Sequence, residues 1–257
     1  MTSKPTLVLL RGLSRDQRHW GSFKSLLQQS LPHYQVTCLD TLGNGTLLDH
    51  KSPLKMDEYG QYLLAQLAEH EIKQPILVGL SLGGMVALST LAQKPEQIHH
   101  VITINSSSNL SPWWQRFSLP WALGHLLFAK RKPHCSRLEY GILQFTSVQQ
   151  NQNIALLQQW SEYRKEANTK LSNSLRQIIA AATFTVDERL KSVGKVSIVS
   201  AMQDRLVNPA CSRQLAQHLA APLFRIENAG HDLALDQPQR LIQTIIQALD
   251  NPATTRP

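Results

Sequence analysis

Ser81 is the side chain with the clearest chemical context in this sequence. It stands in Val78-Gly-Leu-Ser-Leu-Gly-Gly84, a G-x-S-x-G pattern that follows an apolar run and precedes a helical pattern. Glycines two residues before and after the serine let a strand and a helix approach closely, while the serine adopts strained backbone angles. Such a turn exposes the hydroxyl at the N-terminus of the helix, whose N–H groups favour developing negative charge. The pattern predicts a nucleophilic serine; the alternative is a serine in an ordinary glycine-rich turn.

The nucleophile hypothesis requires a base, because a serine hydroxyl attacks poorly until its proton is removed. Among ten histidines, His231 stands in Asn228-Ala-Gly-His-Asp232, a predicted loop between the last strand and the last helix. A ring in such a loop can lie over the edge of a sheet, so His231 is the predicted base. The other nine lie in contexts typical of solvated or helix-surface side chains, among them His19, His99, His100 and His218.

Asp204 is the predicted acid that orients the histidine. It lies in Asp204-Arg-Leu-Val-Asn-Pro209, directly after the strand that precedes the histidine-bearing one. A helix cap or a solvated loop carboxylate is the alternative reading. Asp232 is a weaker candidate, because a residue adjacent to His231 is badly placed to reach its ring. The chain order serine, aspartate, histidine is the order found in hydrolases rather than that of the two main protease classes.

Short apolar runs alternate with amphipathic stretches in the first half of the chain, a pattern typical of parallel α/β sheets. Buried strands are predicted at 6–10, 35–39, 75–78, 101–105, 196–200 and 223–226. Helices are predicted at about 20–30, 56–70 and 83–93, and from about 236 with Pro238 in the first turn. The sequence therefore predicts an α/β fold with a mostly parallel sheet of about six strands flanked by helices.

The pattern changes after Asn105, where a serine-rich stretch, two adjacent tryptophans and helical stretches rich in Gln, Lys and Arg follow. We interpret residues 106–185 as an insertion after the fourth strand. The predicted core then consists of residues 1–105 and 186–257, a length consistent with one large domain carrying an insertion.

The amino-acid composition excludes several classes of protein. Hydrophobic residues make up 42% and charged residues 17%, which excludes a disordered chain and a coiled coil. The three cysteines are widely spaced, which argues against a disulfide framework and against a thiolate zinc site. We therefore expect no metal site, and we expect the protein to lie in the cytoplasm. No apolar run reaches the roughly 18 residues that a membrane span needs, and the first apolar stretch is too short for a signal peptide.

Taken together, these motifs resemble the α/β-hydrolase superfamily, in its small, lid-bearing, esterase-like branch. The resemblance covers nearly the whole chain and rests on Leu7-Val-Leu-Leu-Arg-Gly12, Asp40-Thr-Leu-Gly-Asn-Gly45, the Ser81 motif, Asp204 and Gly230-His231. It implies that residues 106–185 form a helical lid and that the family's leading hairpin is absent. It also implies that the backbone amides of Leu82 and Leu13 form the oxyanion hole.

Two positions depart from the family pattern. The family usually has His-Gly where this chain has Arg11-Gly12, and often Gly-His-Gly where it has Gly43-Asn44-Gly45. Because that first histidine helps to shape the oxyanion loop, the Leu13 assignment depends on what Arg11 does. Arg11 contributes to the substrate pocket, pairs with a carboxylate, or braces the loop by hydrogen bonds to carbonyls.

The predicted lid is rich in apolar side chains. Most of them are expected to pack against the core, and some are expected to line an acyl pocket. The candidates for the substrate pocket are Arg11, Trp113, Trp114 and Phe117.

The leading hypothesis is a serine hydrolase of carboxylic esters that works through an acyl-enzyme on Ser81 and needs no cofactor. A serine at this position favours esters and thioesters over the dehalogenase or epoxide chemistry of an aspartate, with carbon–carbon bond hydrolysis less favoured. The alternative is a small-molecule receptor or binding module with little turnover, which the altered Arg11-Gly12 motif keeps open.

Charge distribution suggests the kind of substrate. Of the net charge of +8, residues 106–186 hold +6, from nine basic and three acidic residues, including the run Lys130-Arg-Lys132. A positive surface near a site attracts anions. This resembles in kind the methyl esterase of biotin synthesis, whose acyl substrate rides on an acidic carrier protein. An acyl-carrier-protein or coenzyme A thioester, or an ester with a free carboxylate, is therefore a candidate, and a solvated surface is the alternative. A nucleic-acid partner is not expected, because no aromatic residues interleave the basic ones.

Overall fold

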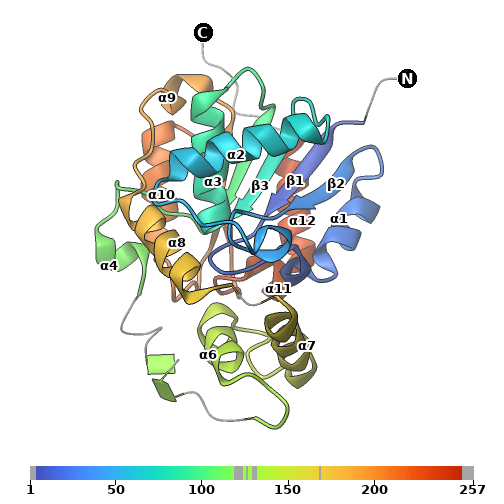
Figure 1. Cartoon of the computed structure of the whole chain (residues 1–257). Coiled ribbons are helices and arrows are strands. Elements are labelled where there is room, and N and C mark those ends of the chain that lie inside the picture. Colours follow the sequence, from blue (N-terminus) through green and yellow to red (C-terminus); the bar gives the residue numbers. More distant parts are fainter. Residues whose placement is uncertain (1–3, 119–123, 126, 129–131, 168, 251–257) are drawn as a thin grey trace.

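The computed structural model describes residues 4–118, 124–125, 127–128, 132–167 and 169–250 (Figure 1). Within these residues, six strands form one parallel sheet in the order β2-β1-β3-β4-β5-β6. The strands are β1 (Thr6–Leu10), β2 (Gln35–Leu39), β3 (Ile76–Leu80), β4 (His100–Ile104), β5 (Val196–Ala201) and β6 (Leu223–Ile226). The prediction of an α/β fold with about six strands is confirmed.

Helices cover both faces of this sheet (Figure 1). One face carries α2 (Met56–Glu69), α3 (Leu82–Gln93), α9 (Leu190–Val193) and α10 (Pro209–Leu219). The other carries α1 (Phe23–Ser30), α11 (Leu233–Asp236) and α12 (Pro238–Asp250). Two 3-10 helices, η1 (Gln17–Trp20) and η2 (Gly45–Leu47), lie in the loops after β1 and β2. In the part of the chain that the structure describes, no helix has the length and hydropathy needed to span a membrane.

Strand β1 shows why continuous apolar runs form these strands. Val8 and Leu10 join the hydrophobic cluster beneath α2 and α3, whereas Leu7 and Leu9 join the cluster beneath α1 and α12. Successive side chains of a strand point to opposite faces, so a strand covered on both sides favours a continuous run of apolar residues. Polar groups are therefore concentrated in the loops that follow the carboxyl ends of the strands.

The ends of two predicted helices differ from the structure. The helix predicted at about 20–30 begins only at Phe23, as α1, because Gly21 has a φ of +51°, which separates α1 from the preceding η1. The C-terminal helix predicted from about Asp236 begins at Pro238, as α12, and Asp236 ends the separate short helix α11. Proline disfavours helical angles in the residue before it but fits the first turn of the next helix.

Residues 105–195 connect β4 to β5, and the segment interpreted as an insertion, residues 106–185, lies within this connection. Its described helices are α4 (Trp113–Arg116), α6 (Arg137–Thr146), α7 (Ile154–Glu166) and α8 (Leu171–Thr183). In Figure 1, α6 and α7 lie below the sheet, whereas α8 lies beside the helices of the sheet's front face. Ala180 and Phe184 join the same hydrophobic cluster as α2 and α3. That the segment works as a lid remains a prediction.

Two histidines expected at the surface are buried instead. His19 is 8% exposed and stacks edge-on against Trp160 and Tyr163 of α7. His100 is 3% exposed, and its Nε2 lies 2.9 Å from Ser197 Oγ on the neighbouring strand. The expectation was wrong because His100 occupies an inward position of a central strand, which only the sheet order reveals. Burial lowers the pKa of each of these histidines to about 4.

His100 should make folding stability depend on acidity. Its pKa is lower in the folded chain than in the unfolded one, so the unfolded state binds the proton more readily. Stability is therefore fully present above about pH 6.5 and falls as the pH drops toward 4. The loss attributable to His100 should be about 2 to 3 kcal/mol. Urea unfolding at pH 7 and pH 4.5 should show a smaller difference for His100→Gln than for the wild type.

The neighbouring His99 is exposed and provides the matched control. His99→Gln should retain most of the wild-type difference between the two pH values. Equal differences for the wild type and His100→Gln would show that the buried ring is not the source.

Candidate active site

Ser81 occupies a strained turn between β3 and α3. Its φ is +57° and its ψ is −116°, angles that a residue with a side chain rarely adopts. A Cβ added to Gly79 would overlap the backbone of Gly83, and one added to Gly83 would overlap the carbonyl of Leu10. The two glycines of the motif are therefore required by close backbone approach. Ser81 is partly exposed at the start of α3, where the amide of Leu82 has no acceptor within the helix.

Asp204 and His231 lie together in the loops after β5 and β6. His231 Nδ1 is 2.7 Å from Asp204 Oδ2, and the two residues are 5% and 8% exposed. The other carboxylate oxygen, Oδ1, accepts hydrogen bonds from the amides of Leu206 and Val207 at 2.8 and 3.0 Å. These amides hold the carboxylate in an orientation that directs its second oxygen, Oδ2, at the imidazole ring. Nε2 is then the ring nitrogen that can exchange a proton with another group.

Asn105 connects these loops, although it was not predicted. It directly follows β4 with a φ of +50°, and its Nδ2 donates to the carbonyl of His231 at 2.9 Å. Its Oδ1 accepts from the amide of Ala201 at the end of β5, at 2.7 Å. The next residue, Ser106, donates from Oγ to the carbonyl of Ser81 at 2.7 Å. The sequence offered one indication of this role for Asn105 and Ser106: both directly follow a strand in the middle of the sheet.

The loop between β1 and η1, residues 11–16, lies against the serine turn; we call it the oxyanion loop. A Cβ added to Gly12 would lie 3.3 Å from Ser81 Cβ, so a side chain there would crowd the serine. Leu13 packs against the core, and the amide of Ser14 donates to Gln177 Oε1 of α8 at 2.9 Å. Ser14 Oγ and Ser174 Oγ are 2.7 Å apart. Helix α8 therefore holds the loop in place from outside the core.

Arg11 is buried and forms an ion pair with Asp232. Its Nη1 and Nη2 donate to the two carboxylate oxygens at 3.1 and 2.6 Å, and its side chain is 4% exposed. Burial alone would raise the pKa of Asp232, but the charge and hydrogen bonds of Arg11 hold that pKa below its ordinary value. Of the roles left open by the sequence, pairing with a carboxylate is the one observed. Both terminal nitrogens of the guanidinium are occupied by Asp232, so the alternative in which Arg11 contributes to the substrate pocket is not the one observed.

The aromatic candidates for the pocket are distributed differently from the expectation. Trp113 and Trp114 are 69% and 62% exposed, whereas Phe117 is half-buried against Phe145, Leu206 and neighbouring residues. The two tryptophans were expected to pack against the core or line a pocket, and the structure leaves them at the surface. They are the first two residues of a four-residue helix after Pro112, and their rings pack edge-on against each other, with 5.9 Å between the ring centres. Lys130 and Arg131 lie outside the described residues.

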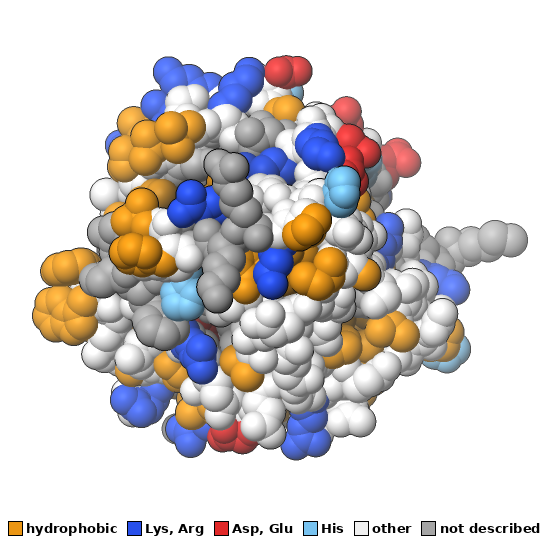
Figure 2. Space-filling view, turned by 90° about the horizontal axis from the view of Figure 1, so that it is seen from below, with side chains coloured by type: hydrophobic (Ala, Val, Ile, Leu, Met, Phe, Trp, Pro, Cys, Tyr) orange, Lys and Arg blue, Asp and Glu red, His pale blue; other side chains and the backbone are white. Residues whose placement is uncertain are grey.

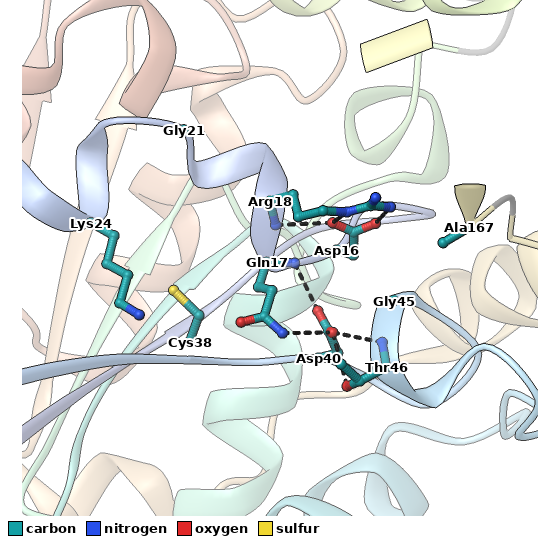
Figure 3. Close-up of a pocket in the computed structure, with 10 residues that line it drawn as sticks. All are labelled: Asp16, Gln17, Arg18, Gly21, Lys24, Cys38, Asp40, Gly45, Thr46 and Ala167. Atoms are coloured by element: carbon teal, nitrogen blue, oxygen red, sulfur yellow. Dashed lines mark hydrogen bonds and ion pairs between the residues drawn. The ribbon is translucent and has the colours of Figure 1, made fainter. Parts of the chain in front are cut away.

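A cavity of about 380 Å³ opens beside the oxyanion loop, and Ser81 is not among its lining residues (Figure 3). Its wall includes Asp40, which accepts hydrogen bonds from the amides of Gln17 and Thr46 at 2.7 and 2.9 Å. Asp16 binds Arg18 through two hydrogen bonds to its guanidinium. These carboxylates are occupied by protein groups, and they anchor the end of the loop.

The sheet brings Ser81, Asp204 and His231 to one edge, because all three follow the carboxyl ends of parallel strands. A hydroxyl at a helix N-terminus and a histidine oriented by a carboxylate are the groups that nucleophilic attack on a carbonyl requires.

Comparison with known proteins agrees with this geometry. The model of the alpha/beta hydrolase family matches residues 7–244. A protein of Pseudomonas syringae named provisionally as the carbamate hydrolase RutD is 27% identical over 242 residues, covering 91% of this chain and 89% of its own. A pimeloyl-[acyl-carrier protein] methyl ester esterase of Xanthomonas oryzae is 35% identical over 92 residues, or 36% of this chain and 33% of its own. The enol-lactonase structure from Burkholderia xenovorans superposes with a TM-score of 0.76 at 18% identity, covering 97% and 92%.

Proposed function

This chain belongs to the alpha/beta hydrolase family, and we propose that it is a serine hydrolase that cleaves carboxylic esters through an acyl-enzyme on Ser81. The observation that carries the proposal is the 2.7 Å contact between Asp204 and His231, at the sheet edge that also bears the strained serine. A buried carboxylate fixed by two amides and directed at a histidine ring is the arrangement that general-base catalysis needs.

In the proposed reaction, Ser81 Oγ attacks the ester carbonyl while His231 Nε2 takes its proton. Asp204 keeps the remaining proton on Nδ1 and stabilises the positive charge that forms on the ring. The amides of Leu82 and Leu13 donate to the tetrahedral oxyanion. His231 then gives its proton to the leaving alcohol. Water, activated by the same ring, hydrolyses the acyl-enzyme and restores the serine.

The test is hydrolysis of short p-nitrophenyl esters together with labelling by a fluorophosphonate, followed by mass analysis of the modified peptide. Turnover and one phosphonyl group on Ser81 are expected, because the probe reacts with activated serines. A wild type that neither hydrolyses esters nor takes the label would contradict the proposal. Tight binding of a small molecule without turnover would favour the alternative of a receptor on a hydrolase fold.

The substrate class that we propose is an anionic acyl compound, such as a carrier-protein or coenzyme A thioester or an ester with a free carboxylate. The basic excess in residues 106–186 supports it, and the face seen in Figure 2 carries many Lys and Arg side chains and few Asp or Glu. The name of the Xanthomonas relative, an esterase acting on an acyl-carrier protein, points the same way.

The same assay can test this substrate class with two esters. For a p-nitrophenyl half-ester of a dicarboxylic acid, kcat/KM should fall as salt rises past about 0.1 M, where charges are screened beyond about 10 Å. The neutral ester should not respond, and charge reversal at Lys130, Arg131 and Lys132 should lower only the anionic rate. Equal responses of both esters would leave the basic residues as a solvated surface.

A further inference from the structure

The buried ion pair of Arg11 and Asp232 joins two loops that the proposed function uses. Arg11 stands two residues before Leu13 in the oxyanion loop, and Asp232 directly follows His231. We call residues 227–232, between β6 and α11, the histidine loop. The partners are 221 positions apart in the chain, and their contact directly joins the segment that carries Leu13 to the segment that carries His231.

The geometry of the pair restricts how the two loops can move. Two parallel N–H···O bonds between a guanidinium and a carboxylate fix both distance and orientation, unlike a single point contact. The indole ring of Trp20 lies beneath the guanidinium, with its centroid 5.0 Å from Arg11 Cζ. On the other side, the amide of Asp232 donates to the carbonyl of Thr146 at 2.8 Å. Each partner is therefore held by a second contact.

Stability alone is a weak reason for this pair. Burying two charges costs solvation free energy that their attraction often does not exceed, and apolar residues of similar size frequently serve as well. Arg11 Nε is also buried without a hydrogen-bond partner, so the site does not satisfy the whole guanidinium. Only the two terminal nitrogens of the guanidinium, Nη1 and Nη2, have hydrogen-bond acceptors here, and both acceptors belong to Asp232. This favours a role in fixing geometry.

A second buried ion pair provides a contrast. Arg15 Nη1 donates to Glu139 Oε2 at 2.6 Å, and Arg164 Nε donates to Glu139 Oε1 at 2.7 Å. Glu139 is 1% exposed, so its burial is at least as complete as that of Asp232. This pair also reaches the oxyanion loop, but it ties the loop to α6 and α7 and does not include the histidine loop. Loss of Glu139 should therefore cost stability without moving Leu13 relative to His231.

We propose that Arg11 and Asp232 are positioning residues that set the oxyanion amide of Leu13 against His231 and Ser81. The pair takes the place of the histidine that usually precedes this glycine in the family. The proposal rests on the proposed function, because it concerns the alignment of the same site. An alignment error of about 1 Å can cost roughly 100-fold in rate without weakening ground-state binding.

The test compares Arg11→Lys, Asp232→Asn and the double variant with Glu139→Gln as the matched buried control. Each is assayed with p-nitrophenyl acetate, and kcat is normalised to the sites titrated with fluorophosphonate, so that partial unfolding does not enter the result. We expect the two single variants to lose about 10-fold to 100-fold in kcat while KM changes less than about 3-fold. The double variant should be no worse than the poorer single, because both lose the same link.

Several results would overturn this proposal. A purely structural pair would lower the melting temperature and the number of titrated sites while kcat for each remaining site stayed at the wild-type value. An equal loss of kcat in Glu139→Gln would show that any buried charge in this region has the same effect. Additive losses in the double variant would show that the residues act separately. A wild type without turnover or labelling would remove the proposed function itself, an outcome distinct from active, undisturbed variants.

Discussion

Ser81→Ala should lower kcat for p-nitrophenyl ester hydrolysis by about 10⁴ to 10⁶-fold, the range typical of nucleophile removal in triad hydrolases. The hydroxyl is the only group of the residue that is lost, and the strained turn should persist because alanine keeps the Cβ. The remaining rate should come from the oxyanion amides and from substrate binding, with water as the nucleophile. Steady-state kinetics at saturating substrate measures the loss, and the fluorophosphonate label should disappear.

Ser89→Ala is the matched control, since Ser89 is a buried serine of the same helix whose Oγ donates to Asp57 Oδ1. Its kcat should stay within about twofold of the wild type, because it lies two turns along the helix from Ser81. Labelling that persists in Ser81→Ala, or a loss of kcat below about tenfold, would show that another group is the nucleophile.

Asp204→Asn should lower kcat by about 10⁴-fold while the fold is retained. The amides of Leu206 and Val207 require an acceptor at the position of Oδ1, so the amide oxygen of asparagine should lie there. Its NH₂ group then faces His231 Nδ1 and demands a lone pair from the ring. The ring must carry its proton on Nε2, where it can no longer accept the proton of Ser81.

The rate loss of Asp204→Asn is measured with the same esters, and circular dichroism and thermal unfolding check the fold. Both amide hydrogen bonds survive the change, so the melting temperature should move only a few degrees while kcat collapses. A decrease below about tenfold would show that another carboxylate orients the ring. Asp232 is the nearest rival in sequence, but Arg11 occupies both of its oxygens.

The sequence by itself determined most of the strand positions and the turn that carries Ser81. Strand β1 ends where its apolar run ends, and all of its positions are buried, as expected for a strand covered by helices on both faces. The turn at Ser81 is equally local, since Gly79 and Gly83 mark where backbone segments approach too closely for any side chain. Asp204 and His231 were predictable from order and position alone, because parallel strands present their following loops at one edge.

Helix α8 shows what periodicity left undecided. Its spacing predicts an amphipathic helix but does not say which face turns inward. Asn173 and Gln177 are buried, while Leu171 and Leu175 are 75% and 53% exposed. The polar face turns inward because the loop after β2 offers it partners: Gln177 Nε2 donates to Asn44 Oδ1, and the amide of Ser52 donates to Asn173 Oδ1. Hydrogen bonds to a distant loop decided the orientation.

Only the tertiary structure decided the fate of Arg11 and the role of Asn105. Arg11 finds its carboxylate 221 positions away, and Asn105 reaches His231 from 126 positions away. Neither contact leaves a local pattern, since each depends on which loops the strand order brings together. Periodicity and motif spacing record the constraints on neighbouring residues in the chain. Buried charges pair with the groups that lie near them in space. Which groups these are is decided only when the sheet has formed and brought its loops together.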